Sequence, residues 1–183
     1  PDRNECSSAD SENPWVFISN DSSVDLKYNE RKIYRLGTYP GPFIKDYRLN
    51  NTGFVIPENM DFDELNYLVN IAFYLGKNTR ITDYAEVYND ITEDKNLIVY
   101  GLSEEKYIKK LNSRLYLKYD TTFKKFEKNE KVSFINNDNK IGALETIKEK
   151  DNRIIVVTAP RKSEAMLALS YLTGNFPNLR GDV

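Results

Sequence analysis

Two continuous apolar runs stand out along the chain, and both are rich in β-branched residues. They cover Asn96–Tyr100 and Arg153–Ala159. A strand that is apolar at nearly every position, rather than at alternate ones, is typical of a parallel sheet covered on both faces. Both runs therefore predict central strands of such a sheet.

A strand followed by a helix precedes the first of these runs. Thr52–Pro57 is a short apolar run that stops at a proline, and Asp61 follows it with Glu64 three residues later. This spacing is that of a capping box, which begins a helix. Gly76 stands where a left-handed residue would end the helix. The apolar positions between them have helical spacing, and they are Leu65, Leu68, Val69, Ala72, Phe73 and Leu75.

Two more helices are predicted further along the chain. The first runs from about Glu104 to Leu111, with Ser103 as its cap. The second runs from Glu164 to Leu172 after the turn Pro160–Ser163, and Gly174 ends it. Its predicted buried stripe consists of Ala165, Leu167, Ala168 and Leu172.

Shorter segments complete the pattern. Tyr84–Tyr88 predicts a strand, and Gly142–Ile147 predicts another, which pairs with the following strand across the turn Lys150–Asn152. The lysine-rich stretch Phe123–Lys131 predicts a solvated hairpin or loop. Asn136–Asn139 is rich in oxygen atoms but lacks the alternating acids of a calcium loop, so we expect a turn and no metal site.

The segment before Asn51 differs from the rest, because it predicts only short strands and turns. Pro40-Gly41-Pro42 cannot extend a sheet ladder and therefore marks a boundary. We expect a β-rich arm over residues 1–45 and an α/β domain over residues 46–183. In that domain a mostly parallel sheet should carry helices on both faces, since parallel neighbours need crossover connections.

The amino-acid composition excludes several kinds of catalytic and metal site. The 183 residues contain no histidine and one cysteine, Cys6. Histidine-based triads, imidazole metal sites and an intrachain disulfide are therefore excluded within this sequence. Lys+Arg 26 against Asp+Glu 28 gives a formal net charge of -2, which argues against a nucleic-acid partner. Carboxylate, lysine or tyrosine chemistry remains, or no catalysis at all.

The candidate site lies where ligands bind in open parallel sheets, beyond the carboxyl ends of the strands. The loops there are Ile56–Asp61, Tyr100–Ser103 and Ala159–Ser163. None of them carries a G-x-G-x-x-G or phosphate-loop pattern, so we expect no cofactor.

Five residues are candidates for binding or catalysis, each with a plainer alternative. Asp61 and Glu64 would be the acid and base of a glycoside hydrolase, or they simply cap a helix, as their spacing favours. Arg161 and Lys162 place two cations beside a helix N-terminus, where an anion is welcome, or they belong to a solvated loop. Trp15, the single tryptophan, would stack on a sugar or pack in a core.

Several apolar blocks with their punctuation extend over nearly the whole chain. They are Cys6, Trp15–Ile18, Ser22 and Ser23, Tyr39–Phe43, Phe54–Pro57, Tyr74–Gly76, Asn96–Gly101 and Ile154–Leu172. Together they resemble the BcsB-like family of cellulose synthase regulatory proteins, the non-catalytic, membrane-anchored partners of the glycosyltransferase that makes and exports cellulose. The blocks up to Phe43 resemble the end of that family's jelly-roll carbohydrate-binding-type domain. The later blocks resemble its flavodoxin-like or ferredoxin-like α/β domain, and Lys118–Asn139 has no counterpart.

The resemblance implies a non-enzymatic, extracytoplasmic accessory domain. Its partners would be the membrane cellulose synthase catalytic subunit and a β-1,4-glucan, with Trp15 and Tyr39 as candidate glycan contacts. Because the chain opens at Pro1, we expect it to belong to a longer parent chain. The resemblance implies that this parent is membrane-anchored, although no run here approaches the roughly 20 apolar residues that span a bilayer. Two alternatives stay open: a glucan hydrolase that uses Asp61 or Glu64, and a purely structural scaffold for protein contacts.

Overall fold

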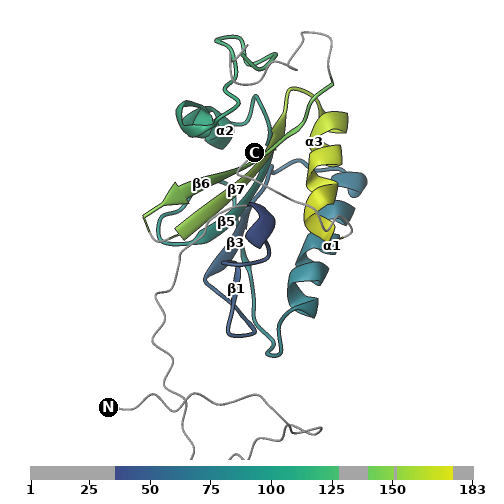
Figure 1. The fold of residues 1–183 in the computed structure, drawn as a ribbon. Coiled ribbons are helices and arrows are strands. Elements are labelled where there is room, and N and C mark those ends of the chain that lie inside the picture. Colours follow the sequence, from purple (N-terminus) through teal and green to yellow (C-terminus); the bar gives the residue numbers. More distant parts are fainter. Residues whose placement is uncertain (1–35, 128–139, 151, 175–183) are drawn as a thin grey trace, which may run out of the picture. The chain divides into compact units, whose positions relative to one another are not determined.

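One mixed sheet of five strands, in the order β4-β3-β5-β7-β6, organises the protein (Figure 1). Its strands are β3 (Thr52–Val55), β4 (Glu86–Tyr88), β5 (Asn96–Leu102), β6 (Ala143–Glu149) and β7 (Asn152–Ala159). The first four strands in that spatial order are mutually parallel, and only β6 runs antiparallel, to β7. The predicted α/β fold with a mostly parallel sheet is therefore confirmed.

The computed structural model describes residues 36–127, 140–150 and 152–174. All of them belong to one unit of the chain, Ile33–Val183. Cys6, Trp15 and Asn136–Asn139 lie outside the described residues, as does most of the predicted β-rich arm, so the division into residues 1–45 and 46–183 stays a prediction.

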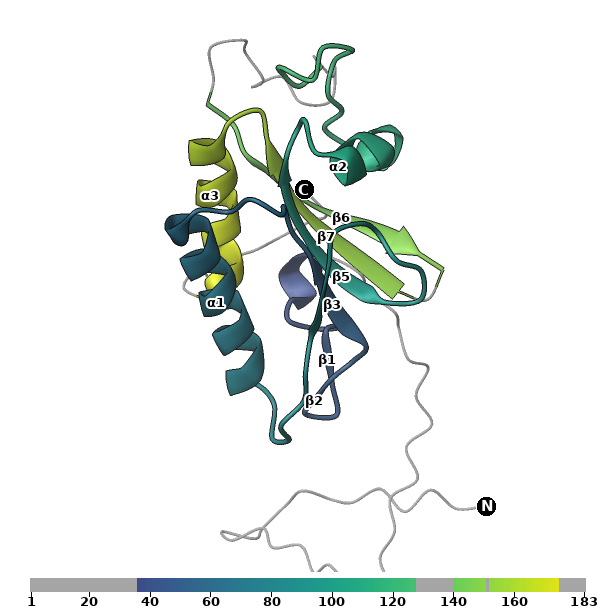
Figure 2. The same ribbon diagram turned by 180° about the vertical axis from the view of Figure 1, so that it is seen from behind.

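Helices cover both faces of the sheet. Helices α1 (Phe62–Lys77) and α3 (Lys162–Ser170) lie side by side on one face, and α2 (Lys106–Leu111) lies on the other (Figures 1 and 2). Three short 3-10 helices in the described part of the chain are Leu36–Thr38 (η1), Asn112–Arg114 (η2) and Tyr171–Thr173 (η3). A small antiparallel hairpin pairs β1 (Ile44–Lys45) with β2 (Arg48–Leu49).

Strand alternation divides the core into two clusters, one on each face of the sheet. On β5, Leu97 and Val99 face the α2 side, whereas Ile98 and Tyr100 face α1 and α3. The same alternation holds along β7. Because every apolar residue of these strands meets one cluster or the other, the continuous apolar runs predicted the central strands correctly.

The segment before β3 packs into the cluster under α1 and α3. Leu36 and Phe43 are buried there, and the side chain of Thr52 donates a hydrogen bond of 2.8 Å to the carbonyl of Phe43. These contacts join the Pro40-Gly41-Pro42 turn to the sheet.

Helix α1 departs from its prediction in two ways. It runs through Gly76 to Lys77, where Asn78 ends it, so the prediction that Gly76 ends the helix is wrong. Of the predicted stripe, Leu68 and Leu75 are buried. The helix contacts the sheet through a narrow seam of Glu64, Leu68, Ile71 and Leu75, which leaves the remaining apolar positions at its surface.

The other two helices begin elsewhere than predicted. Helix α2 starts at Lys106, and Ser103 does not cap it; the backbone N–H of Ser103 instead donates to the carbonyl of Ala159, at 3.1 Å. Helix α3 starts two residues before Glu164, and Leu167 on its predicted stripe is exposed. Gly174, with φ of 81°, ends the helical segment in the left-handed conformation, as predicted.

A buried carboxylate holds the irregular chain that follows η2. Glu145 on β6 is 2% exposed, and its two oxygens accept hydrogen bonds from the backbone N–H groups of Tyr116, at 2.6 Å, and Leu117, at 2.9 Å. Burial raises the pKa of Glu145, and the two hydrogen bonds only partly oppose that effect. Beyond this point Tyr119 and Phe126 form an isolated antiparallel bridge, and both side chains are buried. Residues 128–131 lie outside the described residues, so the solvated hairpin or loop over Phe123–Lys131 stays a prediction.

Glu145 should make stability depend on pH in a defined direction. An acid whose pKa is raised on folding binds its proton more tightly in the folded state, so stability falls as pH rises from the ordinary value of 4.5 through the folded pKa. Glu145→Gln removes this contribution. Urea denaturation at several pH values gives the free energy of unfolding of the wild type and of the variant. We expect the wild-type value minus the variant value to decrease as pH rises. Glu127→Gln, at an exposed site, is the control. A difference that grows with pH would contradict the assignment.

Candidate functional site

The three loops singled out in the sequence meet at one edge of the sheet. Strands β3, β5 and β7 are parallel neighbours, so their carboxyl ends lie together. The bond from the Ser103 N–H to the Ala159 carbonyl ties two of the loops directly. This edge is therefore the candidate site, as expected for an open parallel sheet.

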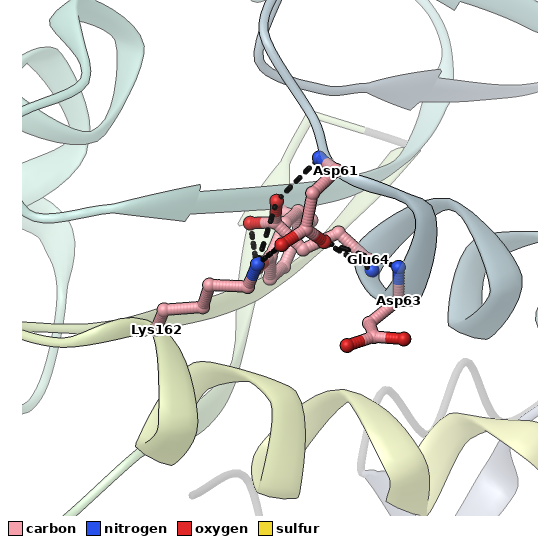
Figure 3. A network of polar contacts seen from close by, with 5 residues as sticks. Asp61, Asp63, Glu64 and Lys162 are labelled. Atoms are coloured by element: carbon pink, nitrogen blue, oxygen red, sulfur yellow. Dashed lines mark hydrogen bonds and ion pairs between the residues drawn. The ribbon is translucent and has the colours of Figure 1, made fainter.

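Asp61 and Glu64 form a complete capping box at the start of α1 (Figure 3). Oδ1 of Asp61 accepts hydrogen bonds from the backbone N–H groups of Asp63, at 3.1 Å, and Glu64, at 3.0 Å. In return, Oε2 of Glu64 accepts from the backbone N–H of Asp61, at 2.9 Å. The capping interpretation of this pair is confirmed.

Lys162 joins the capping box to the start of α3 (Figure 3). Its ammonium group pairs with the carboxylate of Asp61 and lies 3.5 Å from Oε2 of Glu64. The hydroxyl of Tyr100, on β5, donates to Oε1 of Glu64 at 2.7 Å. One buried carboxylate thus connects α1, the central strand and α3, which fixes the spacing of three elements at the site.

Close backbone approach completes this network. The hydroxyl of Tyr107, on α2, donates to the carbonyl of Tyr100 at 2.8 Å. A Cβ atom at position 101 would lie 2.6 Å from that hydroxyl, so the contact requires Gly101. Burial, more than any other cause, raises the pKa values of both tyrosine hydroxyls, and Glu64 adds to the effect on Tyr100. Both hydroxyls, which are protonated at neutral pH even at the ordinary tyrosine pKa of 10.0, therefore remain donors at more alkaline pH as well.

The two cations predicted at the start of α3 have different surroundings. Lys162 faces two carboxylates, so its charge is largely offset within the chain. Arg161 is directed elsewhere: its side chain is 72% exposed and lies 4.0 Å from Oε1 of Glu164. The sequence placed both residues in one anion site, whereas the structure separates their environments; anion contact at either residue stays a prediction.

Tyr39, predicted as a glycan contact, is engaged by the protein itself. Its hydroxyl donates to the carbonyl of Leu172 at 2.9 Å. Its ring stacks on Tyr74, with centroids 5.6 Å apart, and meets the edge of Phe43 at 6.1 Å. Burial, with a smaller effect of Tyr74, raises the pKa of Tyr39. This ring therefore joins η1 to α1 and η3, and the glycan roles of Tyr39 and Trp15 stay predictions.

An apolar groove between α1 and β4 is the feature that the sequence interpretation missed. It encloses about 330 Å³, and among the described residues four exposed large apolar side chains line it, while two more, Phe62 and Phe73, are exposed on α1 outside the lining. We call these side chains the α1–β4 face; they are Phe62, Leu65, Val69, Phe73, Tyr84 and Val87. The sequence does contain a signal for this face, because the apolar positions 62, 65, 69 and 73 have the spacing of a second stripe along the helix, beside the buried seam.

Two absences concern only the part of the chain that the structure describes. No group of three or more acidic, cysteine or histidine side chains there is arranged to hold a metal ion. No helix among the same residues has the length and apolar character needed to cross a membrane.

Asp61 combines a helix cap with an ion pair, and two substitutions should separate them. Asparagine keeps an oxygen that can cap the helix but removes the charge opposite Lys162, whereas alanine removes both. We expect Asp61→Ala to lower the free energy of unfolding by about 1–2 kcal/mol and Asp61→Asn by a few tenths. Urea denaturation measures both, and equal losses would show that the cap is not the dominant contribution.

Comparisons with known proteins identify no family for this chain. No family model matches it, and no curated protein does. A solved structure described as "Structure of CpGH84D" is similar over 72% of this chain, with 17% sequence identity and a TM-score of 0.45. The matching part is 18% of that protein's chain.

Proposed function

We propose that this chain is a non-catalytic, extracytoplasmic accessory domain of a cellulose synthase complex. In this role it binds the membrane cellulose synthase catalytic subunit and helps to guide the exported β-1,4-glucan. The observation that carries the proposal is the α1–β4 face, because it offers an apolar surface for contact with another protein. The resemblance to the BcsB-like family of cellulose synthase regulatory proteins supplies the partner, the location and the membrane anchor of the parent chain.

The side chains of the α1–β4 face are strongly exposed to solvent. Val69 is 55% exposed, Phe73 is 72% exposed and Tyr84 is 84% exposed. Contiguous apolar patches on soluble proteins mark binding surfaces. Large rigid side chains such as Phe and Tyr also supply much of the contact energy at interfaces.

The groove within this face suits a protein partner with an apolar surface. The side of α1 and the edge strand β4 flank it. Its described lining is almost entirely apolar, and Asp83 is its only charged member. An apolar helix or strand of the synthase catalytic subunit would bury these side chains without leaving a charge unpaired.

The hydrogen bonds and the ion pair of Asp61 and Glu64 make the hydrolase alternative less favoured. A glycoside hydrolase needs one carboxyl group to give up a proton and a second one to act as base or nucleophile. Here Asp61 caps α1 and pairs with Lys162, while both oxygens of Glu64 accept hydrogen bonds within the fold. The scaffold alternative uses the same α1–β4 face, but without glucan.

A charge placed on the α1–β4 face should weaken partner binding. Val69→Glu puts a carboxylate into the groove, where a docked apolar surface would leave it unpaired. We expect at least an approximately tenfold loss of affinity for the membrane cellulose synthase catalytic subunit in co-purification and binding assays. Leu167→Glu on α3, where the side chain is also exposed, is the matched control and should bind normally. Equal binding by both variants would contradict the proposed interface.

Glucan guidance predicts weak, saturable binding of cello-oligosaccharides. A moving polymer requires low affinity, so we expect a Kd of about 1 mM or weaker for cellohexaose in NMR titrations. Trp15→Ala should weaken this binding if the predicted stacking contributes. Synthase binding without any cellohexaose binding would favour the scaffold alternative, and hydrolysis of cellohexaose would overturn the non-catalytic assignment.

A further inference from the structure

A second hollow lies at the carboxyl edge of the sheet, and three positively charged side chains among the described residues line it. It encloses about 580 Å³. Three cations line it from three separate parts of the chain: Lys109 on α2, Lys124 on the turn after Tyr119, and Arg161 before α3. We call this site the cationic hollow. Its other described lining residues are Ser103, Glu104, Thr121, Thr122, Phe123 and Pro160.

The charge of this hollow is local and does not reflect a generally basic edge. Glu104 is the only carboxylate among its described lining residues, against three cations. A neighbouring hollow of about 450 Å³ has the opposite balance, with Glu58, Asp90 and Glu105 against Lys106. The whole chain is slightly acidic. Positive charges therefore exceed negative ones by two among the described lining residues, an excess that the neighbouring carboxylates of Asp120 and Glu164 partly offset.

Hydrogen bonds and a ring contact hold two of the cations in position. Oδ1 of Asp120 accepts hydrogen bonds from the backbone N–H and the hydroxyl of Thr122, at 3.1 and 2.8 Å, and from the backbone N–H of Lys124, at 3.3 Å. The ammonium of Lys109 lies 5.5 Å from the centroid of the Phe123 ring. The turn and α2 are thus joined at the hollow, which fixes the positions from which their lysines extend.

Arg161 contributes the third cation from the first residue before α3. No side chain caps α3 at this position, in contrast to the capping box of α1, so the positive end of the helix adds to the potential. Glu164 offsets part of it, at 4.0 Å from the guanidinium. The exposed, planar guanidinium retains the fork of donors that suits an oxyanion.

We propose that the cationic hollow binds an oxyanion, namely the phosphate or carboxylate group of a small ligand. The cations supply charge, and the hydroxyls of Thr121 and Ser103 supply donors at its wall. Lys162, the neighbour of Arg161, is not among the hollow's described lining residues, and its ammonium group pairs with Asp61 and Glu64. This proposal does not depend on the cellulose synthase partner, since the hollow and the α1–β4 face share no lining residue.

The test is an NMR titration of the isotope-labelled full chain with two probes, inorganic phosphate and glucuronate, in separate experiments. We expect saturable shifts at the hollow's residues at concentrations up to about 20 mM, which detects a Kd of about 1 mM. Arg161→Ala and Lys124→Ala should each weaken binding about tenfold. Lys77→Ala, at an exposed site in the last turn of α1, is the matched control and should leave binding unchanged.

The outcomes separate the two sources of the oxyanion. Saturable binding of phosphate alone assigns a phosphate ester, binding of glucuronate alone assigns a carboxylated sugar, and binding of both assigns the shared chemistry. Each of these supports the hollow only if the Arg161 and Lys124 variants bind more weakly. Failure of both probes to saturate, unchanged binding by the Arg161 and Lys124 variants, or an equal loss in Lys77→Ala would overturn the proposal. All three substituted side chains are exposed, so the variants should fold, which their spectra verify.

Discussion

The pairing of β5 with β7 is the constraint on which the rest of the structure depends. Six consecutive residue pairs, from Leu97 with Ile154 to Leu102 with Ala159, lie in parallel register. Both strands are buried on both faces, so neither can face water and each face requires a covering layer. Helices α1 and α3 on one side and α2 with its following turn on the other provide these layers. Parallel register also brings the carboxyl ends of both strands to one edge, which creates the site.

At that edge, some charged side chains pair with each other within the fold, and others remain exposed to solvent. Glu64 is 7% exposed and accepts bonds from α1 and Tyr100, so its cost of burial is offset by hydrogen bonds and by Lys162. Lys162 is therefore part of the framework, whereas Arg161, one residue earlier, remains outside it. Two adjacent cations in the sequence serve different purposes because the helix start directs their side chains to different neighbours.

The elements that sequence analysis predicted well are those whose signals are local. The apolar runs of β5 and β7 and the capping box of Asp61 and Glu64 depend on residues within a few positions of each other, and the structure confirms them. The pairing of Lys162 with Asp61 spans most of the domain, so no local spacing announces it. Ser103 was misassigned as a helix cap for a similar reason: its backbone N–H has a distant partner, Ala159. The α1–β4 face was hidden because helical spacing alone does not tell which of two apolar stripes faces the sheet.

The α1–β4 face and the cationic hollow are built from different residues. The groove draws on the cluster under α1 and α3, through Phe54 and Leu68, whereas the hollow is built from α2, the Thr121–Lys124 turn and Arg161. Substitutions at distant sites without shared partners usually have additive effects. A ligand in the hollow would therefore leave the apolar face available, and a partner docked on α1 would leave the hollow open. Because the groove and the hollow share no described lining residue, the two proposed binding events do not compete for the same side chains.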